Sequence, residues 1–174
     1  MITSLEQKHR ALKNRDDLHI VITKGVGEGP TTLAAFDAAL LDAGVANYNL
    51  IYLSSIIPPG SQIECARYVT PADEYGHRLY VVMARAIAQQ PGEKAWAGVG
   101  WTQNEEDGRG LFVELEGGSK EEVETAIHST LDAMIVTRST AYGPIHAEMA
   151  GIECTANPVC ALVTAVYKSE GWTD

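Results

Sequence analysis

The chain has 174 residues, which suits one domain with a substantial core. Its 23 acidic and 13 basic residues give a formal net charge of −10, which argues against nucleic acid or an anionic membrane as the main partner. No apolar stretch approaches the ~20 residues of a membrane span, and the charged N-terminus lacks the apolar core of a signal peptide. The acidic excess would suit a small cationic ligand, although simple solubility explains it equally well.

Residues 1–17 are polar, and we expect a loose arm or an appended helix there, followed by one domain over residues 18–174. The β-branched run at 19–23 predicts a strand that ends at the glycines of KGVGEGP. Thr31 or Thr32 can then cap a helix, and Gly44 can end it. The 3.6-residue period predicts that its apolar face consists of Leu33, Phe36, Leu40 and Leu41.

Later segments continue this mixture of strands and helices. The alternation in GLFVELEG predicts a strand in which Phe112, Glu114 and Glu116 share one face. Ser119 and Glu122 form a capping box for a second helix. Further strands are expected near residues 50–57, 63–69, 79–88, 95–102 and 161–167. Strands outnumber helices and the two helices stand apart, which is typical of a layered α+β sandwich rather than a doubly wound parallel sheet.

The cysteines and histidines give no sign of a metal site. Cys65, Cys154 and Cys160 are odd in number and lack C-x-x-C spacing, so we expect reduced thiols in a cytoplasmic protein. His146 and Glu148 lie close together in PIHAEMAG, but their spacing matches no zinc signature. We therefore expect no bound metal.

The stretch NYNLIYLSSIIPPG places Ser54 and Ser55 where an apolar strand would continue. If the backbone is strained there, the Ser55 hydroxyl can attack the carbonyl of Ser54 and break the chain. Elimination and hydrolysis would then leave a pyruvoyl group at residue 55, a ketone able to do the work of a Schiff-base cofactor. The alternative is two strand serines that hydrogen-bond to the backbone, and the dipeptide alone favours that alternative.

Three further polar residues are candidates for the same site. Asn49 precedes the serines by ~17–20 Å of extended strand, so it acts with them only if the chain bends; otherwise it closes the turn after the helix. Asp37 could hold a cation in a partly buried pocket or equally lie at a solvated rim. Glu114 suits a general acid if it is desolvated, with Glu116 as the solvated alternative.

In combination, these pieces resemble the pyruvoyl-dependent arginine decarboxylases. Residues 27–60 carry a glycine-rich turn, a helix containing AFD, the step N-x-N-L and the segment SSI-x-PP, in the order found in that family. The similarity continues through PGE at 91–93 and GLFVELEG at 110–117. It covers roughly residues 18–168, and its most specific part is the ordered match over 27–60.

The resemblance implies a role for each matching residue. Ser55 would become the pyruvoyl group, Ser54 would end a small chain of residues 1–54, and residues 55–174 would form the larger chain. Asn49 and Glu114 would match the family's active-site asparagine and its proton donor. The substrate-binding positions would be Asp37, Leu33 and Ile56, with Asp37 receiving a guanidinium group.

The resemblance also implies a four-layer αββα sandwich that forms an obligate trimer or a multiple of trimers, possibly a hexamer, with active sites between subunits. The expected reaction converts L-arginine to agmatine and CO₂ without nucleic acid, membrane or metal. The alternatives are a pyruvoyl-dependent decarboxylase of another amino acid and an unprocessed homologue that lacks catalysis.

Overall fold

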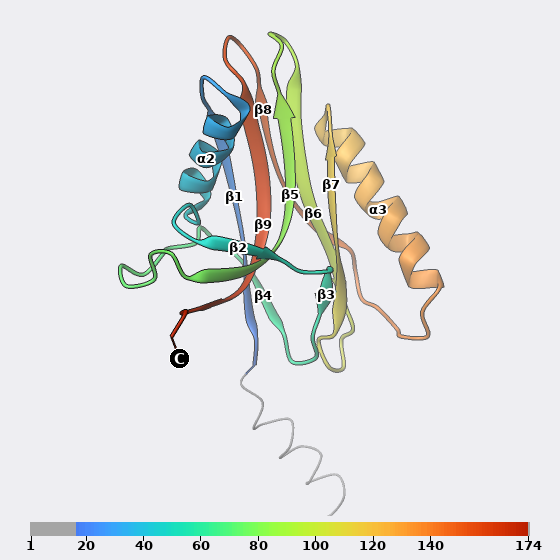
Figure 1. The fold of residues 1–174 in the computed structure, drawn as a ribbon. Coiled ribbons are helices and arrows are strands. Elements are labelled where there is room, and N and C mark those ends of the chain that lie inside the picture. Colours follow the sequence, from blue (N-terminus) through green and yellow to red (C-terminus); the bar gives the residue numbers. More distant parts are fainter. Residues whose placement is uncertain (1–16, 174) are drawn as a thin grey trace, which may run out of the picture.

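The computed structural model describes residues 17–173. The polar arm expected over residues 1–17 therefore lies, apart from Asp17, outside the described residues. The described part of the chain forms two β-sheets that face each other, with one helix packed on the outer face of each sheet (Figure 1). The expected mixed α+β fold is confirmed.

The first sheet has five strands in the order β2-β5-β9-β1-β4. Its strands are β1 (His19–Glu28), β2 (Asn49–Tyr52), β4 (Gln62–Cys65), β5 (Arg78–Ala88) and β9 (Val159–Glu170). The three long strands are antiparallel neighbours, whereas the short strands β2 and β4 run parallel to β5 and β1 at the two edges. The strand expected over residues 63–69 was too long, because residue pairing with β1 ends at Cys65. The Ala66 N–H still bonds to the Ile22 carbonyl at 3.0 Å, and the Tyr68 N–H then bonds to the Thr23 hydroxyl instead of the β1 backbone.

The second sheet has four antiparallel strands in the order β3-β7-β6-β8. Its strands are β3 (Ile56–Ile57), β6 (Lys94–Gln103), β7 (Gly110–Gly117) and β8 (His146–Glu153). The sequence analysis did not predict β8, although the segment PIHAEMAG lies almost entirely within it. Its residues are mostly half-buried, so no clean alternation marks the strand.

Helix α2 (Thr32–Ala43) covers the outer face of the five-stranded sheet. It begins where the Thr31 hydroxyl accepts a hydrogen bond from the Ala34 N–H at 3.1 Å, and it ends at Gly44, whose φ is 82°. The expected apolar face was wrong in part, because Leu33 and Leu41 are 74% and 55% exposed. The buried face consists instead of Ala35, Ala39, Leu40 and Ala43.

The close approach of β1 explains this choice of small residues. A Cβ atom built at Gly27 of β1 would lie only 2.4 Å from the backbone nitrogen of Ala39, and one at Gly25 would lie 2.2 Å from the Ala39 carbonyl oxygen. Glycine on the strand and alanine on the helix therefore let the two backbones pack directly against each other.

Helix α3 (Lys120–Val136) covers the outer face of the four-stranded sheet. The Ser119 hydroxyl accepts from the Glu122 N–H at 3.2 Å, and the Glu122 carboxylate accepts from the Gly118 N–H at 2.8 Å. The first of these bonds is one that the predicted capping box requires, whereas the Glu122 carboxylate bonds to the N–H of Gly118, one residue before the N-cap at Ser119. The buried face is formed by Val123, Ile127 and Leu131.

The hydrophobic core is divided among three interfaces. The largest cluster lies between the two sheets and includes Ile22, Val99, Phe112 and Val163. A second cluster fills the contact between α2 and the five-stranded sheet, and a third fills the contact between α3 and the four-stranded sheet. Neither helix in the described part of the chain is long and apolar enough to cross a membrane. No group of three or more potential metal ligands occurs among the described residues.

Candidate active site

The double serine lies where the chain passes from one sheet to the other. Strand β2 ends at Tyr52, and the Leu53 N–H still bonds to the Val81 carbonyl of the five-stranded sheet at 2.8 Å. Ile56 already pairs with Leu111 in the four-stranded sheet. Residues 54 and 55 therefore form the whole crossing between the sheets.

Ser55 has an unusual backbone conformation. Its φ is 58°, and it is the one non-glycine residue with a positive φ in the described range 17–173. A residue with a Cβ atom in this left-handed region costs roughly 1–2 kcal/mol relative to an ordinary conformation. The carbonyl oxygen of Ser55 accepts a hydrogen bond from the Phe112 N–H at 2.9 Å, which anchors the strained residue to β7.

The side chain of Ser55 is hydrogen-bonded to a carboxyl group. Its hydroxyl donates to Oε1 of Glu114 at 2.5 Å, although the two residues lie 59 positions apart in the chain. Burial raises the pKa of Glu114, and the hydrogen bond from Ser55 lowers it in part. This carboxyl can accept a proton from the hydroxyl when it is ionised and can donate a proton when it is neutral.

Glu114 also lines a cavity of about 340 Å³ beside the crossing. The cavity lies between β5 and β7 and is lined by Tyr52, Met83, Ala84, Arg85, Glu114, Leu115 and Glu116. Its volume falls in the range of small-molecule sites. Glu116 shares the cavity but its side chain is exposed, so the carboxylate at Glu114 is the one near Ser55.

The structure does not bring all of the other predicted site residues to Ser55. Ile56 is 55% exposed and follows Ser55 directly. Asn49 is exposed and donates from Nδ2 to the Gly76 carbonyl at 2.8 Å. Asp37 and Leu33 are exposed on α2, and neither lines the cavity beside Glu114. One chain therefore brings together Ser54, Ser55, Ile56 and Glu114, but it does not bring Asn49, Asp37 and Leu33 into contact with the serine.

The sequence analysis missed one residue at this site. The Tyr167 hydroxyl, on β9, donates to the Ile56 carbonyl at 2.9 Å. Burial raises the pKa of Tyr167, and the nearby charge of Glu114 raises it further, so this hydroxyl stays a neutral donor. Tyr167 ends the apolar run ALVTAVY, where it resembles any core aromatic residue. Only the fold reveals its polar partner.

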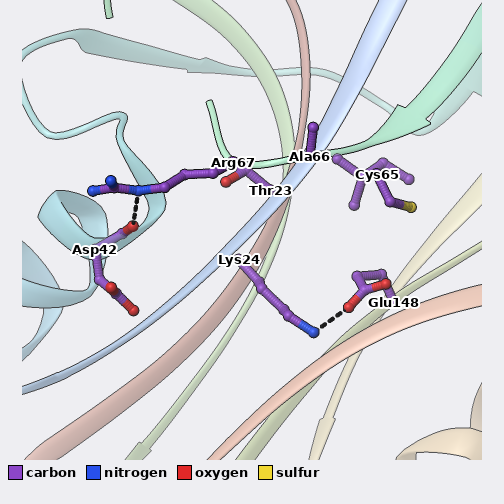
Figure 2. A pocket seen from close by; sticks show the side chains of 8 residues that line it. Thr23, Lys24, Asp42, Cys65, Ala66, Arg67 and Glu148 are labelled. Atoms are coloured by element: carbon purple, nitrogen blue, oxygen red, sulfur yellow. Dashed lines mark hydrogen bonds and ion pairs between the residues drawn. The ribbon is translucent and has the colours of Figure 1, made fainter. Parts of the chain in front are cut away.

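A larger cavity, of about 480 Å³, lies along β1 beside the end of α2 (Figure 2). Lys24 forms an ion pair with Glu148 there, and Nε of Arg67 donates to the main-chain carbonyl of Asp42 at 3.2 Å. None of the predicted site residues lines this cavity. It is therefore a charged surface hollow separate from the serine site.

Comparison with known proteins identifies the class to which this arrangement belongs. The family model for pyruvoyl-dependent arginine decarboxylase matches residues 19–169, so the chain belongs to that family. A protein of this name from Thermococcus sibiricus is 32% identical over 147 residues, which cover 84% of this chain and 92% of that relative.

A second relative of the same name, from Halobacterium salinarum, is 44% identical over 96 residues. That alignment covers 55% of this chain and only 58% of the length of the relative. Among solved structures, a pyruvoyl-dependent histidine decarboxylase matches with 14% identity and a TM-score of 0.39, over 57% of each chain. That structural likeness is too slight to support an argument.

Proposed function

We propose that this chain is a self-processing decarboxylase that converts L-arginine to agmatine and CO₂. The observation that carries the proposal is the strained Ser55, whose hydroxyl bonds to a half-buried carboxyl group at 2.5 Å. A family model that spans residues 19–169 supports the reaction class, and the names of the relatives support arginine as the substrate.

Self-cleavage would begin at the peptide bond between Ser54 and Ser55. Glu114 accepts the hydroxyl proton of Ser55, and Oγ attacks the carbonyl carbon of Ser54. The carbon–nitrogen bond then breaks as the nitrogen of residue 55 takes up the proton held by Glu114, which leaves an ester to Oγ and a free amine on residue 55. Because this step removes the left-handed strain at Ser55, part of its driving force is stored in the folded backbone.

Elimination would complete the cleavage. Residue 55 loses its α-proton, the Cβ–Oγ bond breaks, and Ser54 leaves as the carboxylate that ends the chain of residues 1–54. One water then hydrolyses the remaining enamine at residue 55, releases ammonia and leaves a pyruvoyl group at the start of residues 55–174. The hydroxyl, the strained backbone and the adjacent carboxyl of this chain all fit the formation of such a group.

The pyruvoyl group, once formed, supplies a ketone that binds the substrate amine and draws electrons from its α-carbon. Glu114 then holds the proton to be delivered to that carbon, because burial raises the pKa of this carboxyl and so favours its neutral form. Met83 and Leu115 give this otherwise largely polar cavity an apolar part, and a substrate carboxylate held there would be less well solvated than in water.

We infer that the substrate guanidinium binds Asp37 of a neighbouring subunit in a homotrimer, which could pair into a hexamer. Asp37 and Leu33 lie on the exposed side of α2, where a second copy can present them to the cavity. A carboxylate there can form a charge-assisted, bidentate pair with guanidinium, which lysine cannot match. Asn49 would reach the site in the same assembly.

Two further expectations belong to this proposal. The succession of one helix, two sheets and a second helix supports the four-layer αββα sandwich as the fold of the enzyme, with residues 18–174 as a single domain. The three cysteines are free thiols, which supports a cytoplasmic location.

The first prediction tests the cleavage. The purified chain should give two species by intact mass spectrometry, whereas Ser55→Ala should give one uncleaved species of 18.7 kDa, because alanine has no hydroxyl to attack the carbonyl. Ser54→Ala is the matched control and should still cleave, since residue 54 contributes its carbonyl and not its side chain. A Ser55→Ala protein that divides normally would refute the pyruvoyl mechanism.

The same samples separate the alternatives. An unprocessed homologue would show one mass for the wild-type chain. A processed enzyme that acts on another amino acid would show two masses but would release no CO₂ from arginine in a panel of amino acids. Asp37→Asn should raise the KM for arginine if this carboxylate binds the guanidinium.

A further inference from the structure

Tyr167 makes a polar contact across the largely apolar interface between the two sheets. It lies on β9 in the five-stranded sheet, is 8% exposed, and packs its ring edge-on against Phe112 with 6.1 Å between centroids. Its hydroxyl reaches the other sheet and donates to the Ile56 carbonyl on β3 at 2.9 Å. A buried tyrosine hydroxyl generally needs some partner, but the partner here is the residue directly after the strained serine.

Two consecutive carbonyl groups are consequently fixed on the downstream side of the scissile bond. The Ser55 carbonyl accepts from the Phe112 N–H on β7, and the Ile56 carbonyl accepts from Tyr167 on β9, each at 2.9 Å. These contacts hold the two peptide planes that follow residue 55. The chain cannot rotate these planes to relieve the positive φ of Ser55 unless it breaks a buried hydrogen bond.

The upstream side is fixed as well. The Leu53 N–H bonds to the Val81 carbonyl at 2.8 Å, which ties the preceding residues to the five-stranded sheet. The strain is therefore confined to the two residues between these anchors. Of the anchors, Leu53 and Phe112 use backbone groups that any residue could supply, whereas Tyr167 depends on its side chain.

We propose that Tyr167 is a positioning residue for self-cleavage: by holding the Ile56 carbonyl, its hydroxyl keeps Ser55 in the conformation from which Oγ attacks residue 54. This inference rests on the proposed self-processing function. Tyr167 touches neither the attacking oxygen nor the carbonyl that it attacks. It acts through the backbone of Ile56, and it continues to hold the start of the larger chain after cleavage.

The test compares cleavage rates of full-length chains made by cell-free synthesis, followed by gel analysis at a temperature where circular dichroism shows a folded protein. Tyr167→Phe keeps the ring against Phe112 and removes only the hydroxyl, and it should slow cleavage by ~10-fold, the effect of one buried hydrogen bond on a rate. Tyr48→Phe is the matched control. Tyr48 is 9% exposed and donates to Glu74 at 2.5 Å, away from the serines.

Each outcome decides the inference. The inference is supported if Tyr167→Phe cleaves more slowly than the wild-type chain while Tyr48→Phe cleaves at the wild-type rate. Equal cleavage rates for the two variants overturn it. Thermal unfolding of both variants in the Ser55→Ala background checks for general destabilisation; if Tyr167→Phe does not fold there, the tyrosine is merely structural and the inference fails. If the wild-type chain itself does not cleave, the proposed function fails and this inference falls with it. If the wild-type chain cleaves and Tyr167→Phe cleaves equally fast, this inference fails but the proposed function stands.

Discussion

At the scale of single residues, the contact between Ser55 and Glu114 gives one carboxyl group two uses. An ionised Glu114 can take the proton of the attacking hydroxyl, and a neutral Glu114 can return a proton to the substrate. Burial raises the pKa of this carboxyl, so both forms are accessible closer to neutral pH than they are for an exposed glutamate, whose pKa is ~4.3. The 2.5 Å hydrogen bond places this carboxyl group at the proposed point of cleavage.

The second prediction concerns this carboxyl. Glu114→Gln keeps size and hydrogen bonding but cannot exchange a proton, so decarboxylation of arginine per processed chain should fall by ~10²–10⁴-fold. Glu116→Gln, on the same strand and in the same cavity, should have a much smaller effect because its side chain is exposed and does not contact Ser55. Release of ¹⁴C-labelled CO₂ measures both variants, and the reverse order of effects would assign the proton to Glu116.

The third prediction follows from the sign of the pKa shift. If Glu114 is the base for cleavage, the protonated form is inactive, so the rate of cleavage should rise as pH increases through the raised pKa of Glu114. The rise should therefore occur above pH ~4.3, the ordinary value for glutamate. Glu114→Gln should cleave slowly with no such rise. A wild-type rate that is independent of pH between 4 and 8 would contradict the role of base.

Sequence reasoning reached part of this site. The alternation in GLFVELEG predicted that Glu114 shares a face with Phe112, and the structure places Phe112 in the core between the sheets and Glu114 at the edge of that layer. The contact with Ser55 could not be predicted by pattern, because it depends on β3 pairing with β7. The role of Tyr167 has no signal in the sequence at all.

At the scale of elements, the packing of α2 on β1 depends on glycines that face a helix of alanines. The sequence analysis assigned the core to the leucines of α2, because large apolar residues at helical spacing usually mark a buried face. The close approach of the two backbones corrects this choice in part: Ala35 and Ala39 lie against the glycines, whereas Leu40 is buried as expected. Strand β8 was missed for a related reason, since half-burial of most of its residues hides the alternation.

The fourth prediction tests this packing. In the uncleaved Ser55→Ala background, Gly27→Ala should lower the free energy of unfolding by ~3 kcal/mol, because the new Cβ meets the Ala39 nitrogen at 2.4 Å and the Ala35 oxygen at 2.5 Å. Gly118→Ala is the control: its Cβ would have nothing nearer than 3.6 Å, so the change should be well under 1 kcal/mol. Urea denaturation measures both, and equal effects would disprove the close contact.

At the scale of the whole molecule, the exposed apolar residues of α2 support the proposed contact between copies. Leu33 is 74% exposed and Leu41 is 55% exposed, and the substrate-binding residue proposed beside them, Asp37, lies outside the cavity of its own chain. The two residues proposed for cleavage need no second copy, because Ser55 and Glu114 contact each other within one chain. Cleavage and turnover should therefore depend differently on assembly.

The fifth prediction uses this difference. Sedimentation should show a trimer or a multiple of three for the wild-type protein, and Leu33→Glu should give smaller species that still cleave but turn over arginine at least ~10²-fold more slowly, because no neighbour positions Asp37. Val136→Glu is the control, since Val136 is 84% exposed at the end of α3 and remote from α2. Full turnover by a dissociated Leu33→Glu protein would contradict a shared active site.

The position of the proposed cut has a consequence for the life of the protein. Division after Ser54 would leave β1 and β2 on one fragment, while β4, β5 and β9, their neighbours in the same sheet, would belong to the other. Eight residue pairs join β1 to β9, so the fragments would be interleaved and could not come apart while folded. The larger fragment would contain the whole four-stranded sheet, but neither fragment alone would contain the complete five-stranded sheet. Such a chain would have to fold before it is cleaved. Once the cleaved protein unfolds, its two fragments would no longer be covalently joined, so refolding would require them to associate as separate chains.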